Sequence, residues 1–186
     1  MSPPTVVRDL VVAHTRVLKL PGVARTFEGL ARQARDAHWA HEDYLHEVLS
    51  AEQASRHESV IRQRLREARF PEVKTLDTFD FAAADGLNAT QVHTLARGEW
   101  VTAPENLILA GPIGTGKTHL AIALGVEATK QKRRVLFTRA ADLVPQLLEA
   151  RDARALTRLQ QRLLRVDVLI VDELGFVPFE IGRAHV

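Results

Sequence analysis

The chain has 186 residues, of which 46% are hydrophobic and 26% charged, a balance typical of a globular protein and not of a disordered or fibrous one. It contains no cysteine, which excludes a disulfide framework and a Cys-ligated zinc site and fits a reducing, cytoplasmic setting. The 25 Lys and Arg residues against 23 Asp and Glu give a net charge of +2, too small to indicate nucleic-acid binding by itself. No apolar run approaches the roughly 20 residues that span a bilayer, so we expect no membrane association.

Residues 1–70 predict a small, all-helical domain. Apolar side chains recur at helical spacing through residues 10–18, and Pro21 then interrupts the pattern. A second helix is expected at residues 23–37, and a third, longer one carries an apolar stripe that ends near Phe70.

Residues 71–87 change in character and are interpreted as a linker between two domains. Phe79 and Phe81 alternate with polar residues, and a turn signal follows. After the linker, Asn88 is expected to cap a short helix that stops at Gly98.

The remainder of the chain alternates between short apolar runs and helical patterns. The apolar runs predict strands at residues 106–110, 135–138 and 167–171. Helices are expected at residues 117–130 and between residues 142 and 165. Strands that alternate with helices form parallel sheets covered on both faces, so this part of the chain predicts an α/β domain.

A phosphate-binding loop lies between the first of these strands and the helix after it. The sequence Gly-Pro-Ile-Gly-Thr-Gly-Lys-Thr matches the pattern G-x-x-x-x-G-K-[ST] in the strand and helix context that the motif requires. The glycines let backbone N–H groups surround phosphate oxygens, and the helix start adds the positive end of its dipole. Lys117 would reach the β and γ phosphates, and Thr118 would bind Mg²⁺. The residues expected to bind the nucleotide are Gly111, Pro112, Ile113, Gly114, Thr115, Gly116, Lys117, Thr118 and His119.

Two acidic residues follow the last predicted strand, at the edge where open parallel sheets bind ligands. Asp172 would hold the Mg²⁺ shell, and Glu173 would polarise the water that attacks the γ-phosphate, so Lys117 and Glu173 are the candidate catalytic residues. Such a pair is common at strand ends, but 54 residues after Thr118 it indicates an ATPase. ATP is favoured over GTP because the chain lacks an Asn-Lys-x-Asp sequence that would read guanine.

Five arginines recur at intervals of three and four residues, so that a continuous helix would line them along one side. They are Arg151, Arg154, Arg158, Arg162 and Arg165. One interpretation is a solvated helix face. The other is a contact with nucleic-acid phosphates or with a partner subunit, because arginine rows bind phosphates without reading sequence.

From Leu18 onward the chain resembles the IstB-like ATP-binding proteins, AAA+ helpers of insertion-element transposition that are related to the DnaC helicase loaders. The resemblance rests on residues 18–22, 76–81, 106–125 and 169–179. The last stretch, Leu-Ile-Val-Asp-Glu-Leu-Gly-Phe-Val-Pro-Phe, discriminates best between this family and the loaders.

The resemblance implies an α/β P-loop NTPase fold of AAA+ type with an incomplete parallel sheet, preceded by the all-α N-terminal domain. It implies an ATPase that uses Mg²⁺, assembles on DNA as a homo-oligomer and engages a transposase, with the arginine row facing DNA. A DnaC-like helicase loader is the alternative function. A small-molecule kinase of the P-loop class is disfavoured because Glu173 beside Asp172 suits water activation.

The resemblance stops near residue 180. Family members continue with a strand that ends in a sensor residue and with an arginine finger, whereas residues 181–186, Ile-Gly-Arg-Ala-His-Val, match the translation of a sequencing-library adapter. We therefore expect residues 88–180 to be the first half of an AAA+ domain and residues 181–186 to be non-native. In the AAA+ strand order that the resemblance implies, the sensor strand would lie between the first and last predicted strands, so we expect the fragment to be poorly soluble or partly unfolded. Because the sensor and the arginine finger are absent, we also expect it to hydrolyse little ATP.

Overall fold

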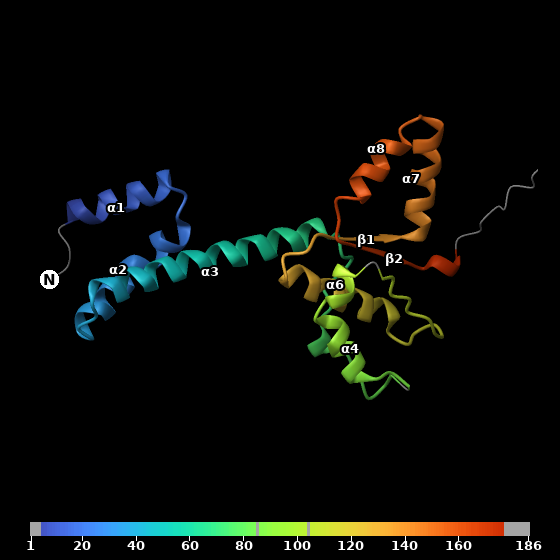
Figure 1. Ribbon diagram of the computed structural model, residues 1–186, viewed down its shortest axis with the longest axis horizontal. Coiled ribbons are helices and arrows are strands. Elements are labelled where there is room, and N and C mark those ends of the chain that lie inside the picture. Colours follow the sequence, from blue (N-terminus) through green and yellow to red (C-terminus); the bar gives the residue numbers. More distant parts are fainter. Residues whose placement is uncertain (1–4, 85, 104, 177–186) are drawn as a thin grey trace, which may run out of the picture. The chain divides into compact units, whose positions relative to one another are not determined.

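The computed structural model describes residues 5–84, 86–103 and 105–176 (Figure 1). The chain packs as two compact units, of which the first ends at Val60 and the second begins at Ile61. The predicted linker, residues 71–87, therefore packs as part of the second unit. The predicted non-native residues 181–186 lie outside the described part. Among the described residues, no helix is both long enough and apolar enough to cross a bilayer.

The described residues of the first unit are all-helical, and the unit ends at Val60, ten residues before the predicted end of the helical domain. Helix α1 spans Thr5–Val17, α2 spans Pro21–Asp36, and α3 begins at His41 and ends at Glu67, past the end of the unit. Pro21 begins α2 and does not merely interrupt the pattern, because the first residue of a helix needs no backbone N–H donor. The core of the unit is formed by Val23, Phe27 and Val48, with Val11, Val12, Leu20, Leu30 and Tyr44 packed against it.

A buried carboxylate joins α2 to α3 within the first unit. Glu52, which is 5% exposed, accepts hydrogen bonds from the backbone N–H groups of Gly22 at 2.7 Å and Val23 at 3.1 Å. Its second oxygen accepts from Nε of Arg56 at 2.8 Å. Burial by itself raises the pKa of Glu52, but the hydrogen bonds from Arg56, Val23 and Gly22 outweigh it and lower that pKa below its usual value.

The second unit contains the α/β part of the chain. Asn88 caps the first of its short helices as predicted, since its side chain accepts a hydrogen bond from the backbone of Gln91 at 3.1 Å. The helices are α4 (Ala89–Ala96), α5 (Glu99–Thr102), α6 (Lys117–Lys130), α7 (Ala140–Asp152) and α8 (Leu156–Leu163). Single turns of 3-10 helix lie at Leu76–Thr78 and Leu174–Phe176.

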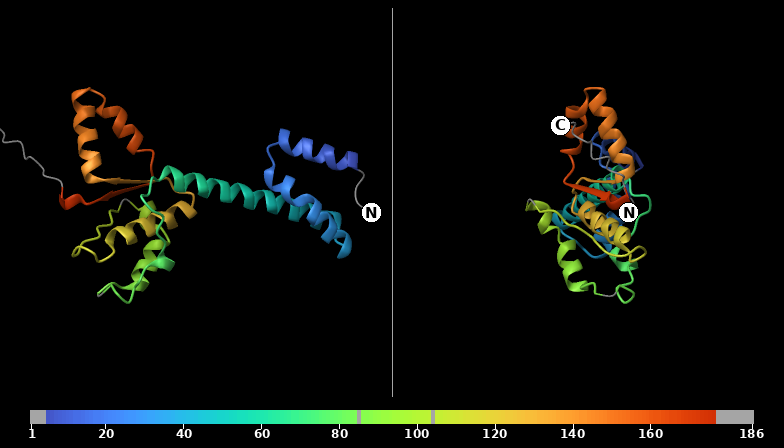
Figure 2. Two further views of the ribbon diagram at one scale, coloured as in Figure 1. Left: turned by 180° about the vertical axis from the view of Figure 1, so that it is seen from behind. Right: turned by 90° about the vertical axis from the view of Figure 1, so that its right-hand side faces the viewer.

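Strands β1 (Val135–Arg139) and β2 (Val168–Asp172) form a parallel pair, as predicted. Their register runs from Val135 opposite Val168 to Arg139 opposite Asp172. Helix α6 covers one face of the pair, and α7 and α8 lie on the other (Figures 1 and 2). The apolar contact beneath α6 is made by Ile122, Val126 and Phe137, packed against Ile170, Leu65 and Phe70. This arrangement brings the carboxyl end of β2 close to the start of α6.

The prediction of a strand at residues 106–110 is wrong. A strand requires a neighbour that exchanges backbone hydrogen bonds with it, and among the described residues none pairs with this segment, so the described sheet has the order β1-β2 only. The side chain of Ile108 is 83% exposed, although Leu109 packs against the core around Leu120. The apolar composition of the segment predicted burial between two neighbours that the described residues do not supply.

Two helices occupy residues 140–163, as predicted, so the five arginines do not share the one continuous helix that would line them along a single side. Helix α7 ends at Asp152, and Arg154 adopts a left-handed conformation with φ of 54°. The N–H of Ala155 bonds to the carbonyl of Ala150 at 2.7 Å, and that of Arg154 to the carbonyl of Arg151 at 3.1 Å. These two bonds form a Schellman motif, which closes the helix and turns the chain into α8. The five arginines are exposed but are divided between two helices, the turn that joins them and the residues after α8.

Candidate nucleotide-binding site

The phosphate-binding loop, residues 111–118, leads directly into α6. Gly114 and Gly116 both have φ of 82°, a left-handed conformation that glycine adopts without a steric penalty. Gly116 is the N-cap residue of α6, and no side chain caps the first turn. The N–H groups of that turn are therefore available to an anion, and the helix dipole favours a negative charge there.

Lys117 folds back over the loop that contains it. Its Nζ donates a hydrogen bond to the carbonyl oxygen of Pro112 and lies 3.5 Å from Oγ1 of Thr115. The Thr115 hydroxyl donates to the same carbonyl at 2.9 Å. The ammonium group thus already lies on the loop, where an incoming phosphate would compete with the Pro112 carbonyl for it.

Thr118 and Asp172, the two predicted magnesium ligands, lie together in the structure. The hydroxyl of Thr118 lies 3.0 Å from each carboxylate oxygen of Asp172, to which it donates. Thr118 is on the first turn of α6 and Asp172 is the last residue of β2, so the packing of α6 on the sheet produces this contact. A hydroxyl and a carboxylate are hard oxygen ligands of the kind that Mg²⁺ prefers. This pair therefore fits a magnesium site beside the phosphate loop.

Glu173 follows β2 directly and is exposed. Its φ of 57° is left-handed, which turns the chain sharply away from the strand direction. Non-glycine residues in this conformation are uncommon and are concentrated at functional sites. The carboxylate is accessible to water next to the predicted magnesium ligand, so its role in water activation stays a prediction that this position allows.

The structure adds a segment that sequence reasoning did not connect to the site. Nε2 of His119, in the first turn of α6, lies 3.0 Å from the carbonyl oxygen of Thr75 and 3.4 Å from Oγ1 of Thr78. The ring of Phe79 meets that of His119 edge to face, with centroids 5.2 Å apart. His119 therefore contacts the linker, and its assignment as a nucleotide-binding residue stays a prediction. The sequence signal that could have indicated an ordered turn at this place is the spacing Thr75-x-x-Thr78, which forms a capping box.

Comparison with known proteins shows the family of this chain. A family model described as the IstB-like ATP binding protein matches residues 13–186. The chain belongs to this family. A candidate ATP-binding protein of insertion sequence IS21 from Pseudomonas aeruginosa is 40% identical over 161 residues, covering 87% of this chain and 61% of the relative. One of insertion sequence IS5376 from Geobacillus stearothermophilus is 32% identical over 178 residues, covering 96% of this chain and 71% of the relative.

A third relative, a candidate insertion sequence ATP-binding protein from Sinorhizobium fredii, is 37% identical over 161 residues, covering 86% of this chain. The IstB-like chain thus spans 61%, 71% and 54% of the length of these three relatives. The predicted family is confirmed, and the activity and partners of the whole protein are proposals.

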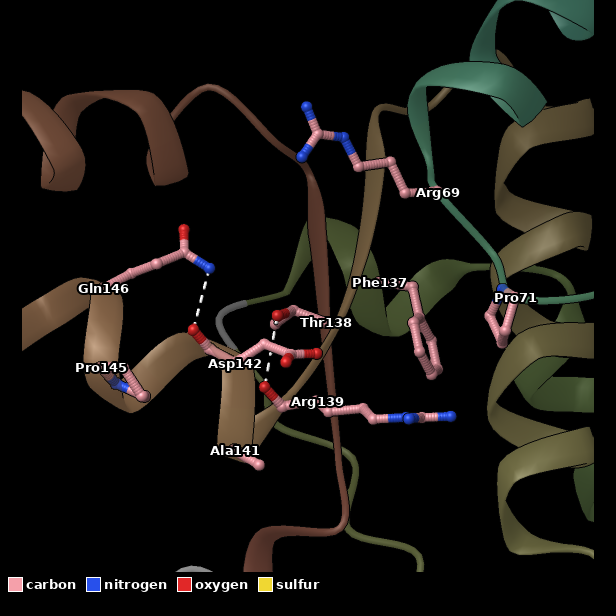
Figure 3. Close-up of a pocket in the computed structure, with 9 residues that line it drawn as sticks. All are labelled: Arg69, Pro71, Phe137, Thr138, Arg139, Ala141, Asp142, Pro145 and Gln146. Atoms are coloured by element: carbon pink, nitrogen blue, oxygen red, sulfur yellow. Dashed lines mark hydrogen bonds between the residues drawn. The ribbon is translucent and has the colours of Figure 1, made fainter.

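A separate cavity of about 580 Å³ lies at the carboxyl end of β1 in this IstB-like chain (Figure 3). Gln146 donates to the carbonyl oxygen of Asp142 at 2.9 Å along one wall. Figure 3 shows the guanidinium groups of Arg69 and Arg139 pointing in different directions, so they do not form one anion site. The lining residues are Arg69, Pro71, Phe137, Thr138, Arg139, Ala141, Asp142, Pro145 and Gln146.

Proposed function

We propose that this chain binds Mg²⁺ and ATP at the phosphate loop and belongs to a whole protein that hydrolyses ATP in insertion-element transposition. The observation that carries the proposal is the double contact between the Thr118 hydroxyl and the two Asp172 carboxylate oxygens at 3.0 Å. It supports the proposal because it brings the phosphate loop and the acid at the end of β2 together across 54 residues of the chain.

Each residue of the site has a defined task in this proposal. The N–H groups at the start of α6 bind phosphate oxygens, and Lys117 leaves the Pro112 carbonyl to bind the β and γ phosphates. Thr118 and Asp172 hold Mg²⁺, which neutralises charge on those phosphates when it is bound. Glu173 orients the attacking water. The loop needs glycine at position 116, where α6 begins, because the backbone there has the left-handed φ of 82°.

ATP binding is tested by titrating the chain with a fluorescent ATP analogue in the presence of Mg²⁺. We expect Lys117→Ala to weaken binding by at least about tenfold, because it removes a charge-assisted contact. Lys130→Ala is the matched control, since Lys130 ends the same helix and pairs with Glu127 at 2.6 Å. Equal affinities of the two variants would refute the assignment.

The magnesium assignment has a sharper test. Asp172→Asn keeps the side-chain volume and removes the charge, so it should abolish the gain in affinity that Mg²⁺ produces and leave metal-free binding nearly unchanged. Asp142→Asn, at an exposed position on α7, is the control. An Asp172→Asn variant that keeps the full magnesium effect would contradict the proposal.

We further propose that the whole protein assembles as a homo-oligomer on DNA and engages a transposase. The support is the name of the relatives, all from insertion sequences, together with the exposed arginines on α7, α8 and the turn between them. These names also favour transposition over helicase loading. If the arginines bind phosphates, replacing Arg158 and Arg162 by Gln should reduce the salt slope of DNA affinity by about 2. An unchanged salt slope would indicate that these arginines form a solvated surface and do not bind DNA phosphates.

A further inference from the structure

The linker segment at residues 75–79 is tied to the first turn of α6 by one histidine. Because a carbonyl oxygen can only accept, Nε2 of His119 carries the hydrogen that it donates to Thr75 at 3.0 Å. The Thr78 hydroxyl donates to the same carbonyl, also at 3.0 Å. Leu76, between them, is buried in the core with Leu120 of α6. One end of the segment is therefore anchored by both polar and apolar contacts.

The other end of the segment reaches the phosphate loop. Phe79 stands so close to Gly116 that a Cβ atom at Gly116 would lie 2.8 Å from Cε2 of its ring. The same ring packs on His119, with centroids 5.2 Å apart, and on Phe81, with centroids 4.9 Å apart. Gly116 has φ of 82° and begins α6. The aromatic ring thus fills the space beside the residue whose backbone shapes the last turn of the loop.

We propose that His119 is a positioning residue, which holds residues 75–79 so that Phe79 braces Gly116 in the conformation that binds phosphate. The inference rests on the proposed ATP binding. Without the tether, the segment gains freedom that nucleotide binding must then remove, and affinity falls. Since the segment lies outside the phosphate-loop motif, movement of the linker changes the nucleotide affinity of the loop without touching any residue of the motif.

Hydrogen exchange without nucleotide tests the tether itself. The backbone N–H groups of Thr78 and Phe79 bond to the carbonyl oxygens of Thr75 and Leu76 at 3.3 and 3.2 Å. In His119→Ala we expect these two amides to exchange about tenfold faster, the effect of losing one hydrogen bond and a ring contact. His119→Gln, whose side-chain amide can donate to the Thr75 carbonyl, should restore exchange to within about threefold.

Affinity for the fluorescent ATP analogue tests the consequence. His119→Ala should raise Kd about tenfold, and Phe79→Leu should do the same with the His119 hydrogen bond intact, since either change removes the brace. The double variant should bind no more weakly than either single one, because both act through one contact. His93→Ala is the control: His93 packs on Phe81 with centroids 5.6 Å apart, but belongs to α4.

Each outcome decides a specific point. If amide exchange is unchanged in His119→Ala, His119 does not hold residues 75–79 and the proposal is refuted. If exchange is faster but the affinity for the ATP analogue is unchanged, the His119 contact is structural only and the positioning role is refuted. If His119→Ala does not fold, Phe79→Leu decides, and wild-type affinity in that variant overturns the proposal. If the unsubstituted chain binds no ATP, the proposed function fails and the positioning role fails with it, while the exchange rates still show whether the tether exists.

Discussion

Glu52 is the residue on which we expect the first unit to depend most strongly. Glu52→Ala removes the acceptor of two backbone N–H groups, those of Gly22 and Val23, and both residues are buried. An unpaired buried donor costs about 1–3 kcal/mol, so the substitution should destabilise the unit by at least about 2 kcal/mol. At roughly 0.05–0.15 kcal/mol of stability per residue, this is a large share of what so small a unit possesses. Glu52→Gln keeps one acceptor oxygen and should cost less, about 1–2 kcal/mol.

Urea unfolding followed by Trp39 fluorescence measures this effect. The chain has two tryptophans, and Trp100 lies in the second unit, so Trp100→Phe leaves Trp39 as the sole reporter of the first unit. The matched control is Glu47→Ala, an exposed acid on the same helix, which should change the free energy of unfolding by less than about 0.5 kcal/mol. If Glu52→Ala and Glu47→Ala unfold at the same urea concentration, our account of the buried carboxylate is refuted.

The pH dependence of the same variants has a defined sign. Because the hydrogen bonds lower the pKa of Glu52 below its usual value near 4.5, the ionised side chain stabilises the folded state above that value. As the pH falls through the folded-state pKa, the carboxylate takes up a proton and this contribution is lost. The stability difference between the unsubstituted chain and Glu52→Gln should therefore be constant at neutral pH and shrink below about pH 4.5. A difference that grows on acidification would contradict the assignment.

Further predictions concern three backbone positions. Arg154→Gly should raise the stability of the second unit by about 1 kcal/mol, measured by thermal unfolding with Trp100 as reporter, because glycine relieves the left-handed strain at φ of 54°; a loss of stability would count against the Schellman assignment. Gly116→Ala should destabilise by about 1–3 kcal/mol more than Gly114→Ala, since both have φ of 82° but only the Cβ at Gly116 meets Phe79, at 2.8 Å. Equal costs would mean that the ring simply moves away. Gly22→Ala should cost up to about 3 kcal/mol, because its Cβ would lie 2.6 Å from Cα of Glu52; near-native urea stability would show that α2 and α3 can separate without loss.

The part of the site that the sequence could predict is the part encoded locally. The phosphate loop is a contiguous motif, and α6, β1 and β2 follow from short-range periodicity. The loop motif also implies a partner acid at the end of a later parallel strand. Both Thr118 and Asp172 are predicted magnesium ligands on this reasoning, and in the structure their oxygens lie 3.0 Å apart.

Three features escaped sequence reasoning because they depend on what lies next to them. The apolar segment at residues 106–110 has strand composition, but pairing requires a neighbouring strand, and none of the described residues provides one. More than one helix was expected between residues 142 and 165, but the place of the break between α7 and α8 was not, because no glycine or proline marks it: Arg154 takes the left-handed position that glycine normally occupies. His119 looks like an extension of the phosphate loop until Thr75 is seen beside it, 44 residues earlier in the chain.

By itself, the sequence determined the phosphate loop, helix α6 and the strand that ends in an acidic pair, because each depends on residue types at fixed local spacing, and its motifs carried the resemblance to the family. Only the tertiary structure decided which strand pairs with which, where the arginines are displayed, and what braces Gly116. These depend on contacts between segments far apart in the chain, such as Phe79 with Gly116, and nothing in the local spacing of either segment specifies that contact.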